Sequence, residues 1–123
     1  KMKKMKIGHY QDILDQIGGN KFLVMTGSKV KYYGYDKNGY AYLRLELTKN
    51  KSKAKFLKIQ LNSKDLYNMT FSKIKKTLNK EYLAIGIKIY DEALENIKTI
   101  EDVYCDQLQE VFTKVTGMYT RLF

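Results

Sequence analysis

The amino-acid sequence predicts an α+β fold: an antiparallel sheet of about five to six strands, with a short N-terminal helix and a longer C-terminal helix packed on one face. Three observations predict it. Strand-like segments outnumber helix-like ones, the connections between successive strands are short, and apolar residues follow helical spacing near both ends of the chain. With 123 residues and 44% hydrophobic side chains, the chain suits a single domain over 1–123, in which residues 1–7 form a basic extension that we expect to be flexible.

The first elements follow from apolar spacing and from glycine stops. A helix is predicted over residues 9–17, because apolar side chains recur there at helical spacing and Gly18-Gly19 follows at once. The apolar run Phe22–Thr26 ends at Gly27-Ser28 and predicts a short buried strand.

A hairpin is predicted around Asn38-Gly39, because these two residues suit a two-residue turn that needs positive φ at both positions. The pairs that follow from this turn are Lys37 with Tyr40, Tyr35 with Tyr42, Tyr33 with Arg44, and Lys31 with Glu46. One face of the hairpin is then apolar and the other carries the tyrosines and cations. A slip of one residue would exchange the two faces.

The remaining elements read as strands followed by one helix. The segment Ala54–Leu61 alternates as a half-buried strand, and 68–76 with 82–90 predicts a hairpin around Asn79-Lys80. A final helix over about 100–116 would end at Gly117. Its apolar stripe consists of Ile100, Val103, Tyr104, Leu108, Val111, Phe112 and Val115.

Charge is the strongest compositional bias of the chain. There are 23 Lys and Arg against 13 Asp and Glu, which gives a net charge of +10. Residues 1–90 carry twenty basic and six acidic side chains (+14), and residues 91–123 carry three basic and seven acidic ones (−4). Such a field attracts polyanions, chiefly nucleic acid, or an acidic protein surface. No uncharged run exceeds seven residues, which argues against a membrane span.

Tyrosines interleaved with cations form the candidate binding site. Aromatic rings on a sheet can stack on unpaired bases, at about 1–3 kcal/mol per base, while neighbouring cations hold phosphates. The candidate residues are Lys31, Tyr33, Tyr35, Lys37, Tyr40, Tyr42, Arg44, Lys49, Lys51, Lys53, Lys55, Phe56 and Lys58. The same pattern is equally typical of cross-strand tyrosine pairs that only stabilise a hairpin, of a surface that binds a protein partner, and of a homodimer surface.

No catalytic, metal or cofactor site is expected, and we expect the protein not to be an enzyme. His9 and Cys105 are the sole residues of their types and lack spaced partners for zinc or haem. We expect Cys105 to be a buried or half-buried packing residue of the last helix. Asp102, Asp106 and Glu110 would line one stripe of that helix, either as a solvated face or as part of a two-metal nuclease site.

Six short segments together resemble small proteins of unassigned activity encoded by bacteriophages, plasmids and integrated elements of low-GC bacteria. They are residues 17–22, 25–27, 50–54, 58–63 with 65–67, 104–109 and 116–122. The resemblance extends over most of the chain, with the lysine-rich start outside it. The resemblance implies a mobile-element accessory protein in the bacterial host cytosol, and such proteins handle DNA or antagonise host defence. We therefore expect nucleic-acid binding through the basic, tyrosine-rich face. The alternative is a protein-interaction inhibitor of a host defence complex, of the anti-CRISPR kind, whose partner processes nucleic acid.

Overall fold

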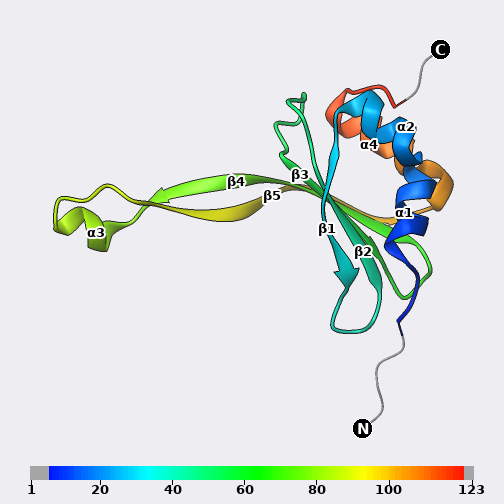
Figure 1. The fold of residues 1–123 in the computed structure, drawn as a ribbon, viewed down its shortest axis with the longest axis horizontal. Coiled ribbons are helices and arrows are strands. Elements are labelled where there is room, and N and C mark those ends of the chain that lie inside the picture. The colour runs from blue at the N-terminus through cyan, green and yellow to red at the C-terminus, as the bar shows by residue number, and fades with distance from the viewer. Residues whose placement is uncertain (1–5, 121–123) are drawn as a thin grey trace, which may run out of the picture.

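The computed structural model describes residues 6–120 and confirms the α+β fold (Figure 1). Two short helices, α1 (Tyr10–Ile17) and α2 (Gly19–Thr26), precede a sheet whose strands pair antiparallel in the order β1-β2-β3-β4-β5. In chain order the later elements are β1 (Lys29–Tyr35), β2 (Ala41–Glu46), β3 (Phe56–Leu61), β4 (Tyr67–Leu78), α3 (Lys80–Ala84), β5 (Tyr90–Val103), the 3-10 turn η1 (Cys105–Gln107) and α4 (Leu108–Thr116).

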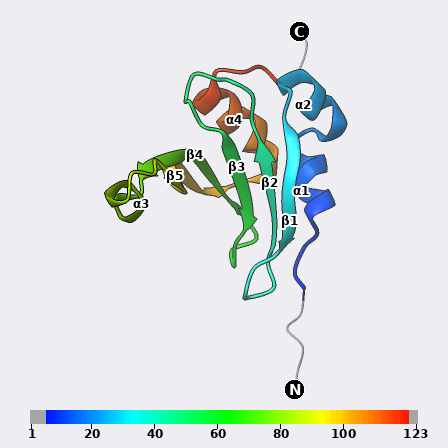
Figure 2. The same ribbon diagram turned by 60° about the vertical axis from the view of Figure 1, so that its left-hand side comes forward.

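The hydrophobic core lies between the sheet and three helices. Figures 1 and 2 both show α1, α2 and α4 on the same side of the sheet. Alternate residues of β2 and β3, such as Leu43 and Ile59, are fully buried beneath these helices. Phe22 of α2 meets Phe112 of α4 edge to face, with ring centroids 4.8 Å apart. Within residues 6–120 the opposite side of the sheet carries no helix, and we call it the open face.

The prediction of a strand at Phe22–Thr26 is wrong, because these residues belong to α2. Phe22 and Thr26, four residues apart, are both buried on one side of that helix, while Val24 is 76% exposed. The Thr26 hydroxyl donates a hydrogen bond to the carbonyl of Phe22. An apolar run this short does not separate a strand from a helix by periodicity, and the packing of Phe22 on Phe112 decides it.

The first hairpin exists, but its predicted register is wrong by one residue. Asp36 pairs with Tyr40 instead of Lys37, because the Asp36 carboxylate accepts hydrogen bonds from the amides of Asn38 and Tyr40 at 2.8 and 3.0 Å. The loop therefore holds three residues and ends at Gly39 with a φ of 89°. Strand β1 then pairs Gly34 with Tyr42.

Strands β4 and β5 continue beyond the rest of the sheet as a two-stranded arm, residues 73–95, which points away from the helices (Figure 1). The prediction of a second strand over residues 82–90 is wrong, because the segment that pairs with β4 begins at Tyr90. Asn79 caps α3 by accepting hydrogen bonds from two backbone amides, and Gly86 has a φ of 83°. The alternating isoleucines of 85–89 therefore lie at the exposed tip of the arm.

The predicted C-terminal helix is half right. Residues 99–103 form the end of β5, where Ile100 pairs with Met69 and Val103 with Tyr67, and the helix begins only at Leu108. It ends as predicted at Gly117, whose φ is 75°.

Candidate functional site

The centre of the open face is a row of paired side chains that crosses four strands. Tyr32 of β1 pairs with Arg44 of β2, Arg44 with Lys58 of β3, and Lys58 with Thr70 of β4. Directly paired residues of an antiparallel sheet point to the same side. Because Leu43 and Leu45 on either side of Arg44 are buried under the helices, this row faces away from them.

Arg44 is the residue of this row whose polar groups are least satisfied. Its Nε is buried and has no hydrogen-bond partner among residues 6–120. The ion pairs of residues 6–120 lie elsewhere: Lys64 with Asp102, and three pairs between Lys73, Lys75 or Lys76 of β4 and Glu92 or Glu95 of β5. The guanidinium therefore keeps its capacity to donate to a ligand.

A hollow of about 250 Å³, which we call the corner hollow, lies where the arm leaves the sheet. The open face contributes Lys31, Tyr32, Arg44 and Phe56 to its lining, and the arm contributes Ile74, Glu92, Ala93 and Leu94. Lys31 is the extra residue of a β-bulge, since the β1–β2 register shifts between Val30 and Tyr32. A bulge re-aims side chains, and here Lys31 and its neighbour Tyr32 both reach the hollow.

Aromatic rings and cations contact one another across the open face. The Nζ of Lys58 lies 4.9 Å from the ring centroid of Tyr42, and that ring covers Gly34, where a Cβ would come within 3.4 Å of the tyrosine hydroxyl. The Nζ of Lys55 lies 6.0 Å from the ring centroid of Phe56. These contacts hold two cations beside rings without neutralising them.

Two predicted site residues, Tyr33 and Tyr35, lie on the wrong side of the sheet. The one-residue register change turns both toward the helices, as their partners Leu43 and Ala41 are buried there. Tyr33 stacks on Tyr10 of α1, and Tyr35 is half-buried with the Nζ of Lys6 5.2 Å from its ring centroid. The prediction that four tyrosines share one open face is therefore wrong.

The hairpin end of the predicted site is tied to the N-terminal segment. Tyr40 packs partly against the core, and Ile7 bridges to it through hydrogen bonds with the backbones of Gly39 and Ala41. Lys37 is exposed in the loop. Of the predicted N-terminal extension, residues 1–5 lie outside the described part of the chain.

The predicted lysine track lies in the loop between β2 and β3. Lys49, Lys51, Lys53 and Lys55 are all exposed. Asn50 holds this loop by donating to the carbonyls of Thr48 and Ala54 at 2.8 and 2.9 Å, and the amide of Lys51 donates to Thr116 of α4. The loop is thus held to the helix side of the sheet at Thr116 and leads along the chain into Phe56 of β3.

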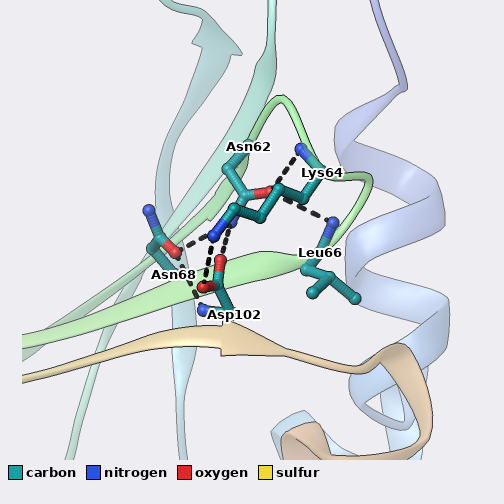
Figure 3. Close-up of polar contacts among 5 residues, drawn as sticks. All are labelled: Asn62, Lys64, Leu66, Asn68 and Asp102. Atoms are coloured by element: carbon teal, nitrogen blue, oxygen red, sulfur yellow. Dashed lines mark hydrogen bonds and ion pairs between the residues drawn. The ribbon is translucent and has the colours of Figure 1, made fainter.

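The acidic residues do not form the predicted helical stripe, because Asp102, Asp106 and Glu110 lie on β5, η1 and α4. Asp102 accepts hydrogen bonds from Asn62 and Lys64 at 2.9 and 3.0 Å, and its own amide donates to Asn68 (Figure 3). This polar clamp joins the β3–β4 turn to the end of β5. The hydrogen bond to Asp102, with the aspartate's charge, raises the pKa of Lys64 above its usual value.

The two remaining candidate residues are His9 and Cys105, which lie at the start of α1 and in η1. His9 caps α1, with its Nδ1 accepting from the amide of Gln11 at 3.2 Å. Cys105 is exposed in η1, so its predicted burial in the last helix is wrong. Over residues 6–120, no group of three or more His, Cys, Asp or Glu is arranged to hold a metal ion, and no helix is long and apolar enough to cross a membrane.

Five predicted residues do come together on or beside the open face: Lys31, Tyr42, Arg44, Phe56 and Lys58. Sequence reasoning missed Tyr32, which it assigned to the apolar face. The signal that could have found it is Asp36, because an aspartate at the start of Asp-Lys-Asn-Gly favours a type I turn with a glycine bulge over a two-residue turn. It also missed Ile74 and Leu94, which reach the site only through the arm.

Comparisons of the chain with protein-family models, with curated proteins and with solved structures give no match.

Proposed function

We propose that this protein binds single-stranded nucleic acid across the open face of its sheet. The observation that carries the proposal is the pairing of Arg44 with Lys58. These two cations lie directly opposite each other, and neither has a carboxylate partner within residues 6–120. Like charges in this position destabilise a sheet. A polyanion that neutralises both would remove that cost.

The aromatic side chains on the same surface support an unpaired strand as the ligand. Tyr32, which is 58% exposed, Tyr42 and Phe56 surround the two cations. A protein ring can stack on a base only where that base is not already stacked between its neighbours in a duplex. All four bases have an aromatic face, so such stacking depends little on the sequence. The ligand would therefore bind with little sequence preference.

The wider charge distribution favours the same ligand. Strands β1 to β4 and the lysine loop all belong to residues 1–90, whose net charge is +14. The loop lysines 49–55 extend the cationic surface beyond the open face, and the lysines would capture phosphates before bases reach the rings.

The test is a titration of labelled oligothymidylate and of its duplex with poly(dA), at several salt concentrations. We expect tighter binding of the single strand, with a log–log salt slope of about −0.7 per phosphate contact. Tyr32→Ala should weaken binding by about 5- to 160-fold if one stacked base is worth about 1–3 kcal/mol. Tyr104→Ala is the matched control, because Tyr104 is also 58% exposed and lies after β5. Absence of binding at low salt, or equal losses in both variants, would contradict the proposal.

Binding to a host protein is a second candidate function, and the tip of the arm favours it. The side chains of Tyr82, Leu83, Ile85, Ile87 and Ile89 are all exposed, Ile85 by 70%. Apolar groups gathered at the end of a projecting hairpin are typical of a protein-interaction site. In this role the protein would block a nucleic-acid-processing complex of host defence.

The two functions are separable by experiment. Immobilised protein is exposed to nuclease-treated host lysate, alongside a variant with Ile85→Ser and Ile87→Ser. A partner that the wild type retains and the variant loses would support the second function, provided that both bind oligothymidylate equally. Retention of the same proteins by both would count against it.

A further inference from the structure

The starting point is the buried Nε of Arg44, which has no hydrogen-bond partner. A guanidinium presents five N–H donors in a planar fork and cannot lose its charge. Leaving one of these donors buried and unpaired is unfavourable, and the cost is larger for a charged group than for a neutral one. An acceptor supplied by a ligand in the corner hollow would remove this cost.

The corner hollow has the size for such a ligand. Its volume of about 250 Å³ is several times the share of one water in the liquid, which is about 30 Å³. It can therefore hold a phosphodiester group with part of an attached sugar. The arm borders one side with Ile74 and Leu94, so the guanidinium has apolar neighbours on that side.

The charges around the hollow select an anion. Lys31, placed by the bulge, adds a second positive charge to that of Arg44. The acidic residue in the described lining is Glu92. Its Oε1 lies 3.9 Å from the Nζ of Lys76 on the neighbouring strand of the arm, so it forms an ion pair there. Two oxygens of one phosphate match the fork of an arginine, and a lysine complements it as a point charge.

The rings beside the guanidinium point to a phosphate within a chain of nucleotides. Tyr32 is paired with Arg44 on one side, and Phe56 lies in the adjacent row of β3 on the other. We propose that the corner hollow is a phosphate subsite in which Arg44 binds one phosphodiester with two hydrogen bonds, Lys31 neutralises it further, and the flanking bases stack on Tyr32 and Phe56. This inference rests on the proposed single-strand function and names its anchoring contact.

The first experiment measures oligothymidylate affinity for Arg44→Lys, Lys31→Gln and the control Lys114→Gln, which removes an exposed charge on α4. Arg44→Lys keeps the charge but loses the fork, so affinity should fall about tenfold or more, as expected when charged hydrogen bonds are lost. Lys31→Gln should reduce the magnitude of the salt slope by about 0.7. Lys114→Gln should change neither quantity. Thermal unfolding of each variant verifies that it is folded.

The second experiment follows the Nε–H resonance of Arg44 by NMR while thymidine 5′-monophosphate or thymidine is added. A shift with the nucleotide and none with the nucleoside is the expected result. If oligothymidylate binds but Arg44→Lys binds it as tightly as the wild type, the subsite is wrong and the proposed function stands. If the wild type does not bind oligothymidylate, the proposed function fails, and the NMR titration decides separately: a nucleotide-dependent shift supports the phosphate subsite, and its absence overturns it.

Discussion

Tyr33 of β1 stacks on Tyr10 of α1, with ring centroids 3.8 Å apart and ring planes inclined by 24°. The contact fixes Tyr33 on the helix side of the sheet, while the next residue toward the N-terminus, Tyr32, lies on the open face. Two neighbouring tyrosines of one strand thus have different roles. One joins the first helix to the sheet, and the other is available to a ligand.

Replacing each of the two tyrosines by alanine should separate stability from binding. Tyr33→Ala removes the stacked pair and should lower the free energy of unfolding by about 1 kcal/mol, measured by urea denaturation. Its affinity for oligothymidylate should stay within about twofold of wild type, because the ring is absent from the open face. Tyr32→Ala should weaken the binding of oligothymidylate and leave the free energy of unfolding nearly unchanged. A stability loss in Tyr32→Ala that exceeds the loss in Tyr33→Ala would contradict this assignment.

The polar clamp of Figure 3 should depend on Asp102 far more than on Lys64. Asp102 adopts a φ of 56° and connects through hydrogen bonds to Asn62 and Asn68. Asp102→Ala should cost about 2 kcal/mol of unfolding free energy, because it leaves the Asn62 amide with one partner fewer and removes the polar side chain that makes positive φ accessible to aspartate.

The side chain of Lys64 is exposed where it forms its ion pair with Asp102, and exposed ion pairs contribute little to stability. Lys64→Met should therefore leave the unfolding free energy unchanged within error. Urea denaturation of both variants measures the difference. Equal losses would show that the exposed ion pair, and not the asparagine network, holds the β3–β4 turn to β5.

Stability should fall at alkaline pH through Tyr67. Burial, the largest cause, raises the pKa of its phenol above 10.0, with nearby negative charges adding to the effect. The folded protein therefore holds the proton more tightly than the unfolded chain. Its contribution is complete below the unfolded pKa of about 10 and is lost as pH rises through the folded pKa.

Tyr67→Phe tests this pH dependence. Urea denaturation from pH 8 to 11 should show a steeper decline of the unfolding free energy in the wild type than in the variant. Parallel pH profiles of the two proteins would mean that Tyr67 does not contribute to the loss of stability at alkaline pH. Tyr104→Phe serves as the control because Tyr104 is exposed.

The tip of the arm should be dispensable for folding. Residues 80–90 are all exposed, and the hairpin below them is held by pairs such as Leu78 with Tyr90. Replacing residues 79–89 by Asn-Gly closes the same strands with a two-residue turn. We expect the free energy of unfolding to change by less than about 1 kcal/mol and the affinity for oligothymidylate to persist. Loss of folding would show that the tip packs on the domain.

Local pattern predicted some elements well for a physical reason. In β3 the pleat alone places Leu57, Ile59 and Leu61 on one side, and all three are buried. The first helix and the glycine end of α4 follow equally local rules of spacing and capping. Arg44 and Lys58 were assigned to the same face because both strands alternate.

Other elements could not be derived locally, since their partners are distant in the chain. Ile100 and Val103 fit a helix by spacing, yet they complete a strand because β4 offers paired partners for residues 90–103. The tip isoleucines alternate as a strand would, but α3 and Gly86 leave them unpaired and exposed. In the first case hydrogen-bonded partners far away along the chain override local preference. In the second case the cap at Asn79 and the positive φ of Gly86 replace the expected strand with a helical turn.

By itself, the sequence determined the α+β class, the excess of positive charge in residues 1–90, and the alternation that separates core from surface on β2 and β3, because composition and the two-residue pleat are local properties. Tertiary structure decided which tyrosine of β1 faces outward and what stands beside Arg44. Those outcomes depend on the Asp36 hydrogen bonds that set the hairpin register and on an arm that brings Ile74 and Leu94 to the open face from later in the chain. Contacts between distant segments arise only when the whole sheet assembles.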